Sequence, residues 1–221
     1  MHPTDSDVIS PSCTATHLAV EPKILYFGTP VALISTENED GSFNLAPMSS
    51  AWALGQVVVL GLGAQGQTAH NLRTRPELVI NLPSAALWQA VERLAPLTGR
   101  YPVPPTKHAD CRFEPEKFAA AGLHAAPADR VRPPRVVECP LQLEAYADRV
   151  GPSSTGGFVI VEASVRKVHA HRDIVVPGTD HIDPAAWNPL IYNFRHYFGL
   201  GRELGHTYRS ETPRGTEHSG T

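Results

Sequence analysis

The sequence is poor in cysteine, in charge of one sign and in long apolar runs. Its three cysteines among 221 residues are odd in number and far apart, which is typical of reduced thiols in a cytoplasmic protein rather than of a disulfide framework. No stretch approaches the roughly 20 apolar residues of a membrane span, and the N-terminus lacks the charged segment and apolar run of a secretory signal. The net charge of −3 comes without a basic concentration, so we expect neither nucleic acid nor a membrane as the main partner.

Recognisable hydrolase and metal signatures are missing as well. No serine stands in a G-x-S-x-G elbow, and no cysteine pair or H-E-x-x-H spacing accompanies the histidines. His169 and His171 would point to one face of a strand, with His181 further along, so the spacing alone permits a metal site. Without a supporting ligand pattern we expect no metal, and we interpret these histidines as surface residues on a rim.

Proline and short apolar segments are what the chain has in quantity. Its 21 prolines favour strands and ordered loops over long helices, and an apolar content of 42% is enough for one sizeable core. Turn-bounded apolar runs predict strands over 24–27, 30–36, 43–46, 56–62, 77–82, 136–147, 157–169 and 190–194. Short helical patterns cover 67–74, 85–94 and 115–121.

The hairpin-like spacing of these strands predicts a single, mainly β domain. We expect an antiparallel barrel of six or seven strands with short helices covering its ends. A polar turn containing Gly41 joins two of the strands as a hairpin. The domain is expected to span 21–208, after a mobile N-terminal arm (1–20) and before a disordered tail (209–221).

Residues 41–84 form the most informative block of the chain. Small and amide residues fill 44–50, after the hairpin turn, and Thr68 and Asn71 open a helix after a second strand. Hydroxyls and backbone N–H groups at strand ends and helix starts are well placed to bind an anion. The block therefore predicts a site for an anionic ligand.

A glycine motif inside this block also matches a different fold. The run Gly61-Leu62-Gly63-Ala64-Gln65-Gly66 fits the G-x-G-x-x-G fingerprint of dinucleotide-binding Rossmann domains. That fold needs an acidic residue at the end of the next strand to hold the ribose, whereas this strand ends Asn81-Leu82-Pro83-Ser84. The helix between is short for a crossover and no strand–helix alternation follows, so we do not expect a Rossmann domain.

The order of these pieces resembles the flavin reductase-like FMN-binding split-barrel family, which contains flavoredoxin and the flavin reductase components of two-component monooxygenases. The resemblance runs from about residue 22 to about residue 208 and rests on the order and spacing of its pieces together. The matching pieces are 30–36, 44–50, 68–72, 76–82 and 137–144. It implies an antiparallel split β-barrel with short covering helices, and FMN as the cofactor, with FAD as the alternative.

The resemblance gives the candidate cofactor-binding residues their roles. Ser49, Ser50 and Thr68 would donate hydroxyl hydrogen bonds to the FMN phosphate, together with the N–H groups at the helix start. Asn71, on the same helical face as Thr68, would reach the same oxygens, and Asn81 would bond the ribityl chain or the ring edge. The backbone of 46–48 would pass along the isoalloxazine. The full set is Asn44, Ala46, Pro47, Met48, Ser49, Ser50, Thr68, Asn71 and Asn81.

Several of these residues have a plainer alternative. The two serines are also typical of turns, and Thr68 is also a good helix N-cap. Asn81 at a strand end can serve only its own backbone. Trp52 fits either a core position or a place beside the flavin. The sequence leaves these alternatives open.

Residues 187–208 gather aromatic, arginine and histidine side chains. They fit a dimer interface or a barrel-closing strand, and they equally fit a wall of the flavin or nicotinamide pocket. In the second interpretation Arg195 or Arg202 would meet a phosphate and His196 would bond flavin or substrate. The candidate substrate-binding residues are Trp52, Arg195, His196 and Tyr197.

The leading functional hypothesis is an FMN-binding oxidoreductase. It would take hydride from NADH or NADPH and pass electrons to free flavin, a partner monooxygenase or another acceptor. Hydride chemistry belongs to the cofactor, so no catalytic side chain is assigned. Two alternatives stay open: a flavin-dependent oxidase or oxygenase with its own small organic substrate, and a non-catalytic flavin-binding barrel. The resemblance also implies a homodimer with the flavin at the subunit interface, which would cover the aromatic surface of 187–208.

Overall fold

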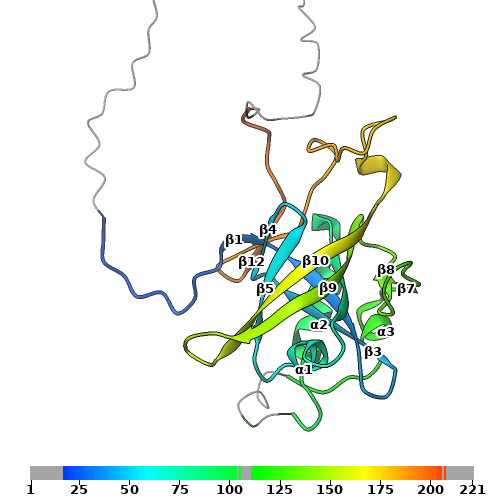
Figure 1. Ribbon diagram of the computed structural model, residues 1–221. Coiled ribbons are helices and arrows are strands. Elements are labelled where there is room, and N and C mark those ends of the chain that lie inside the picture. Colours follow the sequence, from blue (N-terminus) through cyan, green and yellow to red (C-terminus); the bar gives the residue numbers. More distant parts are fainter. Residues whose placement is uncertain (1–16, 104, 106–110, 206, 208–221) are drawn as a thin grey trace, which may run out of the picture.

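Figure 1 shows the computed structural model of the chain, in which long strands form a barrel and short helices pack beside it. The structure describes residues 17–103, 105, 111–205 and 207. The predicted tail (209–221) lies outside these residues, as does most of the predicted arm (1–20), so both stay predictions. Residues 17–26 form an irregular segment that leads into the first strand. None of the helices in these described ranges is long and apolar enough to cross a membrane.

The main sheet has seven strands in the order β3-β2-β6-β9-β10-β5-β4. Their bounds are β2 Ala32–Glu37, β3 Phe43–Met48, β4 Ala51–Leu54, β5 Val57–Gly63, β6 Glu77–Leu82, β9 Leu141–Pro152 and β10 Phe158–Ala170. Every neighbouring pair in this sheet is antiparallel. The predicted antiparallel barrel is therefore confirmed, and the glycine run at the end of β5 does not belong to a parallel Rossmann sheet.

The hairpin of β2 and β3 shows how local sequence sets the register of this sheet. Gly41 in the connecting turn has φ of +83°, a conformation that glycine adopts without steric cost. The backbone N–H of Ser42 donates to Asp40 Oδ1 at 3.0 Å, which holds the turn closed. Thr36 then pairs with Asn44, so the polar start of β3 lies beside the polar end of β2.

The two edge strands of the sheet, β3 and β4, follow one another directly in the chain. Only Ser49 and Ser50 separate them, so the sheet must curl until its two edges approach each other. The N–H of Gly61 on β5 donates to the carbonyl of Ser50 at 2.8 Å, which ties the connection to the next strand. The barrel is thus split between its edge strands β3 and β4, and we call this opening the seam. Ser49 and Ser50, the two predicted phosphate-binding serines, connect its two sides.

Two apolar clusters lie on opposite faces of β2. Ala32 and Ile34 belong to the barrel interior, which is filled mainly by residues of β5, β6, β9 and β10. Val31 and Leu33 belong to a second cluster beneath the helices. Because strand side chains alternate between faces, one short apolar strand stabilises both layers.

The helices are short, as predicted, and they cover one side and one end of the barrel. They are α1 Gln67–Leu72, α2 Trp88–Leu94 and α3 Lys117–Ala121, with 3-10 turns η1 Ala85–Leu87, η2 Ala95–Leu97 and η4 Arg172–Ile174. The buried apolar side chains of α2 and Ala121 of α3 pack in the second apolar cluster. A two-stranded ribbon, β7 (Ala125–Ala126) with β8 (Arg135–Val136), lies on the same side.

A second, three-stranded sheet was only partly foreseen from the sequence. It contains β1 (Phe27–Pro30), β11 (Ile191–Asn193) and β12 (His196–Phe198) in the order β1-β11-β12. The short strands β4 and β12 were not predicted, because neither carries a long β-branched run. The predicted strand 136–147 starts later, at Leu141, because Cys139 N–H closes a turn on Val136 and Pro140 has no N–H to donate.

Candidate functional site

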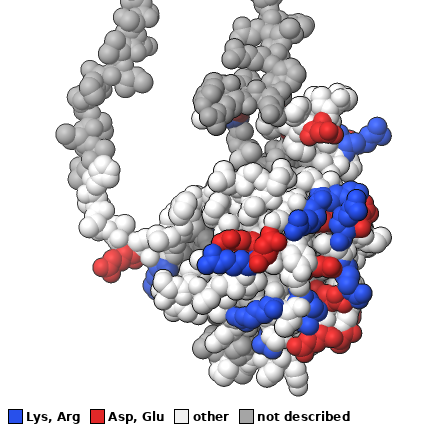
Figure 2. Space-filling view, viewed as in Figure 1, with Lys and Arg blue, Asp and Glu red and all other residues white. Residues whose placement is uncertain are grey.

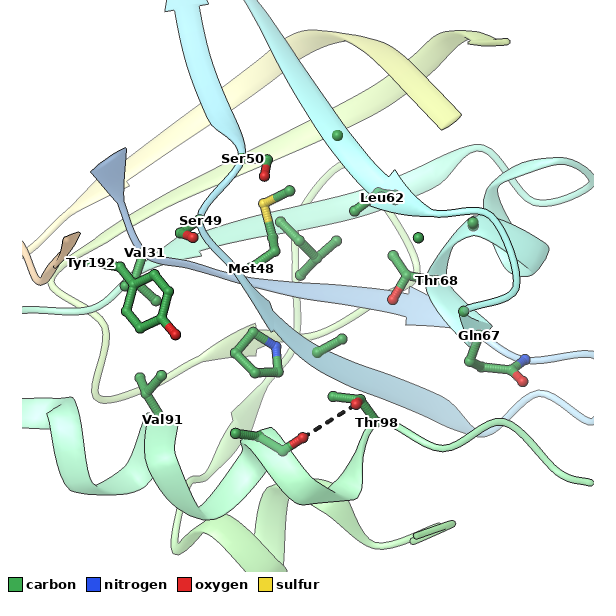
Figure 3. Close-up of a pocket in the computed structure, with 18 of the residues that line it drawn as sticks. Val31, Met48, Ser49, Ser50, Leu62, Gln67, Thr68, Val91, Thr98 and Tyr192 are labelled. Carbon is green, nitrogen blue, oxygen red and sulfur yellow. Dashed lines mark hydrogen bonds between the residues drawn. The ribbon is translucent and has the colours of Figure 1, made fainter. Parts of the chain in front are cut away.

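A cavity of roughly 360 Å³ opens at the seam of the barrel, between β3, β5, α1 and α2. Figure 3 shows Gln67 and Thr68 at one end of it and Val31 and Tyr192 at the other, with Met48 between them. The cavity is therefore elongated, with a polar end and an aromatic end. The polar end, the middle and the aromatic end of the cavity are each built from different segments of the chain.

The polar end is organised by a buried amide and a buried ammonium. Asn44 Nδ2 donates to Thr68 Oγ1 at 3.0 Å, and Lys117 Nζ donates to Asn44 Oδ1 at 2.6 Å. All three residues line the cavity, and Lys117 is only 4% exposed. An ammonium and a hydroxyl at one cavity wall are donors that an anionic ligand can accept from, and hydrogen bonds that join charged groups are the stronger ones.

Lys117 was missed by the sequence analysis. The helical pattern over 115–121 was recognised, but its single lysine was not assigned to the buried face. Lys117 and Ala121 are both buried, as residues four apart on one helical face should be. That spacing was the available signal, and it marks a lysine beside an apolar stripe.

The middle of the cavity is the strand end 46–50, predicted as the isoalloxazine segment. Ala46, Pro47, Met48, Ser49 and Ser50 all line the cavity, opposite Gly61 and Leu62 of β5. A Cβ atom at Gly61 would come within 3.2 Å of the Ser50 Cβ. The close approach of β5 to the seam therefore depends on glycine at this position.

The aromatic end is a row of three tyrosine rings in edge-on and tilted contact. Tyr26 and Tyr192 have ring centroids 5.4 Å apart, and Tyr192 and Tyr197 are also 5.4 Å apart. The hydroxyl of Tyr197 donates to Glu92 at 3.0 Å. Burial, followed by the contact with the Glu92 carboxylate, raises the pKa of Tyr197, so this phenol stays protonated at neutral pH.

Two of the predicted cofactor residues, Asn71 and Asn81, do not line the cavity. The amide of Asn71 donates to Thr36 Oγ1 at 3.0 Å and to Asn38 Oδ1 at 2.9 Å. The amide of Asn81 donates to the carbonyl of Leu33 at 3.0 Å and accepts from the N–H of Val136 at 2.8 Å. Both side chains are fully buried and join separate segments of the chain.

The remaining candidates are divided between the cavity and the surface. Thr68 is the second residue of α1, and Gly66 occupies the N-cap, so the N-cap alternative for Thr68 is wrong. Tyr197 lines the cavity. Trp52 is 59% exposed on β4, and Arg195 and His196 are exposed in the β11–β12 hairpin; none of these three lines it.

The histidines considered as metal ligands diverge. His171 accepts a hydrogen bond from the N–H of Asp173, whereas His169 Nε2 meets Glu144 Oε1 at 2.5 Å. Asp129, Glu144 and His169 bring their possible ligand atoms within 4.8 Å of one another. The Glu144 carboxylate on β9 already accepts hydrogen bonds from the backbone N–H groups of Asp129 and Arg130. These hydrogen bonds hold the loop that precedes β8 against the sheet.

The antiparallel split barrel with a polar and aromatic cavity at its seam defines the flavin reductase class of split-barrel proteins. The family described as "Flavin reductase like domain" matches residues 24–201. The chain therefore belongs to the flavin reductase-like family, and the family implies flavin binding.

Individual proteins are similar to this chain in sequence or in fold. A protein of Bacillus subtilis (strain 168), uncharacterized protein YdfE, is 46% identical over 195 residues, which cover 87% of this chain and 94% of that protein. Flavoredoxin of Desulfovibrio vulgaris (Miyazaki F) has a similar fold, with a TM-score of 0.72, 18% identity and coverage of 89% of this chain and 100% of the other. Nitrilotriacetate monooxygenase component B from Bacillus cereus gives a TM-score of 0.69, 16% identity and coverage of 87% and 100%.

Proposed function

We propose that the chain binds FMN in the seam cavity and acts as an NAD(P)H-dependent flavin reductase. Electrons would pass from the bound flavin to free flavin, a partner monooxygenase or another acceptor. The observation that carries the proposal is the division of one elongated cavity into a hydroxyl and ammonium end and an aromatic end. FMN has the same division, with a phosphate dianion at one end and a flat ring system at the other.

The polar end fits the phosphate of FMN. Thr68 offers a hydroxyl and Lys117 a buried ammonium, and hydrogen bonds that join charged groups are roughly twice as strong as neutral ones. Gln67 and Thr68 add backbone N–H groups at the start of α1. Asn44 holds Thr68 and Lys117 in place through its two amide atoms.

The rest of the cavity fits the ribityl chain and the ring. Its volume lies within the range of about 300–1,000 Å³ that is usual for cofactor and ligand pockets. Ser49 and Ser50 lie where hydroxyls can meet the ribityl chain or the phosphate, and the backbone of 46–48 can run along the ring edge. Bound flavin supplies the hydride-accepting centre, while Tyr192 and Tyr197 offer rings against which a planar group can pack.

The direct test is the absorption spectrum of the purified protein with added FMN, followed by NADH or NADPH without oxygen. We expect a perturbed flavin spectrum that bleaches on addition of the reductant, and steady-state oxidation of NAD(P)H when an acceptor is present. Heat-denatured protein is the control for free flavin. A protein that leaves the FMN spectrum and fluorescence unchanged would remove the flavin from this cavity. Binding without bleaching would refute the reductase proposal and favour a non-catalytic flavin barrel.

We also propose that the active unit is a homodimer that closes the seam. Trp52 and Leu54 are 59% and 77% exposed on β4, an edge strand that begins directly after Ser50. Exposed apolar edge strands are usually covered by another chain or element. The outer face of β9 and β10 is charged where the β4 edge is apolar. Charges of both signs lie side by side on that face (Figure 2), and Arg149 and Glu162 form an exposed ion pair at 2.9 Å.

Sedimentation of the wild type and of Leu54→Glu checks the dimer. The wild type should sediment as a dimer at micromolar concentration, and FMN should strengthen the dimer by linkage. Leu54→Glu should sediment as a monomer and bind FMN more weakly, because a charge at an apolar contact opposes association. Val168→Glu, at a 49% exposed position on β10, is the matched control. A monomeric wild type with tight FMN binding and full NAD(P)H turnover would contradict the shared site.

A further inference from the structure

The segment that leads into β1, residues 17–26, carries apolar side chains that the described part of its own chain leaves exposed. Leu18 and Val20 are 78% and 74% exposed, and Leu25 is 67% exposed. Figure 1 shows this leading segment running away from the barrel. Residues two apart lie on the same face of an extended chain, so Leu18 and Val20 form one apolar face. An extended segment with such a face is suited to packing on a surface outside its own domain.

The leading segment leaves its domain at one end of the three-stranded sheet. At that end, Phe27 of β1 pairs with Asn193 of β11, which pairs in turn with His196 of β12. Just beyond these residues, the N–H of Phe194 donates to the carbonyl of Tyr26 at 2.6 Å. Within the described ranges, no earlier residue of the segment is hydrogen-bonded to the domain. The segment is therefore anchored only at its root.

An apolar groove of roughly 330 Å³ lies at the other end of that sheet. Its lining residues are Ala85, Trp88, Leu190, Tyr197, Phe198 and Gly199. Trp88 and Phe198 are 45% and 50% exposed, and the ring centroids of Trp88 and Tyr197 are 6.3 Å apart. Phe198 pairs with Ile191, and Ile191 pairs with Pro30. The groove thus lies at the end of the sheet opposite to the root of the leading segment.

These positions favour a groove on another copy of the chain as the place where the segment packs. To reach its own groove, the segment would have to reverse its direction and run back past β11 and β12. Fully extended, its ten residues span about 33–36 Å, which is enough to reach a neighbouring molecule. Its root, Tyr26, lines the seam cavity together with Ser49 and Ser50. The proposed homodimer puts the second copy at this seam.

We propose that the leading segment of each chain crosses the seam and packs in the groove of the partner subunit, with Leu18 and Val20 against the aromatic rings that line it. The inference rests on the proposed homodimer and adds the surfaces that the two chains exchange. Tyr197 lines both the groove and the seam cavity. The segment would therefore pack behind a wall of the partner's flavin site, so that each chain helps to enclose the cofactor of the other.

Sedimentation equilibrium of charge variants on the two surfaces tests the exchange. Val20→Asp on the segment and Phe198→Asp in the groove should each raise the dimer dissociation constant about tenfold or more, because each replaces apolar burial by a charge. Both side chains are half or more exposed in the single chain, so the fold should persist, as circular dichroism can verify. Val137→Asp, at a 56% exposed valine directly after β8, is the matched control and should leave the constant unchanged.

A mixture of the two variants separates exchange between chains from packing on the same chain. In a mixed dimer, the chain with Phe198→Asp keeps an intact leading segment and the chain with Val20→Asp keeps an intact groove. Exchange restores one of the two contacts, so the mixture should associate more tightly than either variant alone. Packing on the same chain would leave both contacts broken and give no gain on mixing.

Two outcomes would overturn the inference while the homodimer stands. The first is a dimer whose dissociation constant neither variant alters, and the second is a mixture that associates no more tightly than its components. Failure of the underlying proposal looks different, because then the wild type itself sediments as a monomer and the exchange is refuted with it.

Discussion

Lys117→Met is expected to weaken FMN binding by about 10- to 100-fold and to leave riboflavin binding nearly unchanged. Charge-assisted hydrogen bonds contribute about 1.5–3 kcal/mol, and each 1.4 kcal/mol is tenfold in affinity. Riboflavin lacks the phosphate, so it has no group that meets the ammonium. The measurement is fluorescence titration of both flavins with the wild type and the variant.

The control for this prediction has to separate binding from folding. Methionine matches the length of the lysine stem, and an apolar residue of similar volume is often tolerated where a charge was buried. Lys117→Arg, which keeps the charge, should retain more of the preference for FMN over riboflavin than Lys117→Met does. Lys23→Met changes an exposed lysine and should behave as wild type. A ratio of FMN to riboflavin affinity that is unaltered in Lys117→Met would take the lysine out of the phosphate site.

Glu144→Ala is expected to destabilise the fold by about 3–5 kcal/mol, the usual cost of removing one partner of a buried charged network. The side chain is fully buried and accepts the N–H groups of Asp129 and Arg130 at 2.9 and 2.6 Å and His169 Nε2 at 2.5 Å. Alanine would leave these donors without their acceptor. Urea unfolding of the wild type and the variant measures the difference.

The same carboxylate predicts a pH dependence. Burial alone would raise the pKa of Glu144, but hydrogen bonds from the Asp129 N–H, His169 and the Arg130 N–H outweigh it and lower the pKa below its usual 4.5. A group with a depressed pKa stabilises the fold fully above its unfolded value and loses that contribution as the pH falls through the folded value. The stability gap between wild type and Glu144→Ala should therefore be constant near neutral pH and narrow below about pH 4.5.

Glu162→Ala is the matched control, because Glu162 lies on the neighbouring strand in an exposed pair with Arg149. Exposed ion pairs contribute about 0–1 kcal/mol, so this variant should unfold close to the wild type at every pH. If Glu144→Ala were no less stable than Glu162→Ala, the loop before β8 would not depend on this carboxylate.

Local patterns in the sequence were sufficient to predict most strands of the main sheet and the strand end that lines the middle of the cavity. Alternating burial, turn residues and short helical stripes are properties of neighbouring residues, and these patterns located β2, β3, β5, β6 and β10 closely. Residues 46–50 were singled out because small residues follow a strand end, and they line the cavity. Their assignment as flavin ligands stays a prediction until the binding measurements are made.

Two candidate residues, Asn71 and Asn81, lie where a short-range rule permits two outcomes, and neither lines the cavity. Asn71 shares a helical turn with Thr68, but its amide faces Thr36 and Asn38 across the start of the hairpin. Asn81 ends a strand, as a ligand-binding asparagine would, but it bonds the backbone of Leu33 and Val136. Spacing along the chain gives the face of an element, and only the neighbouring elements determine what that face meets.

The sequence by itself determined the antiparallel barrel, its short helices and the likeness to the flavin reductase-like family, because these follow from periodicity, turns and the order of short segments. The tertiary structure alone decided that Lys117 meets Asn44, a residue 73 positions earlier in the chain, and that the groove beside Trp88 shares Tyr197 with the seam cavity. Such contacts depend on how the sheet curls at Ser49 and Ser50 and on where α2 and α3 pack. They are long-range consequences of burial, and no local pattern in the chain encodes them.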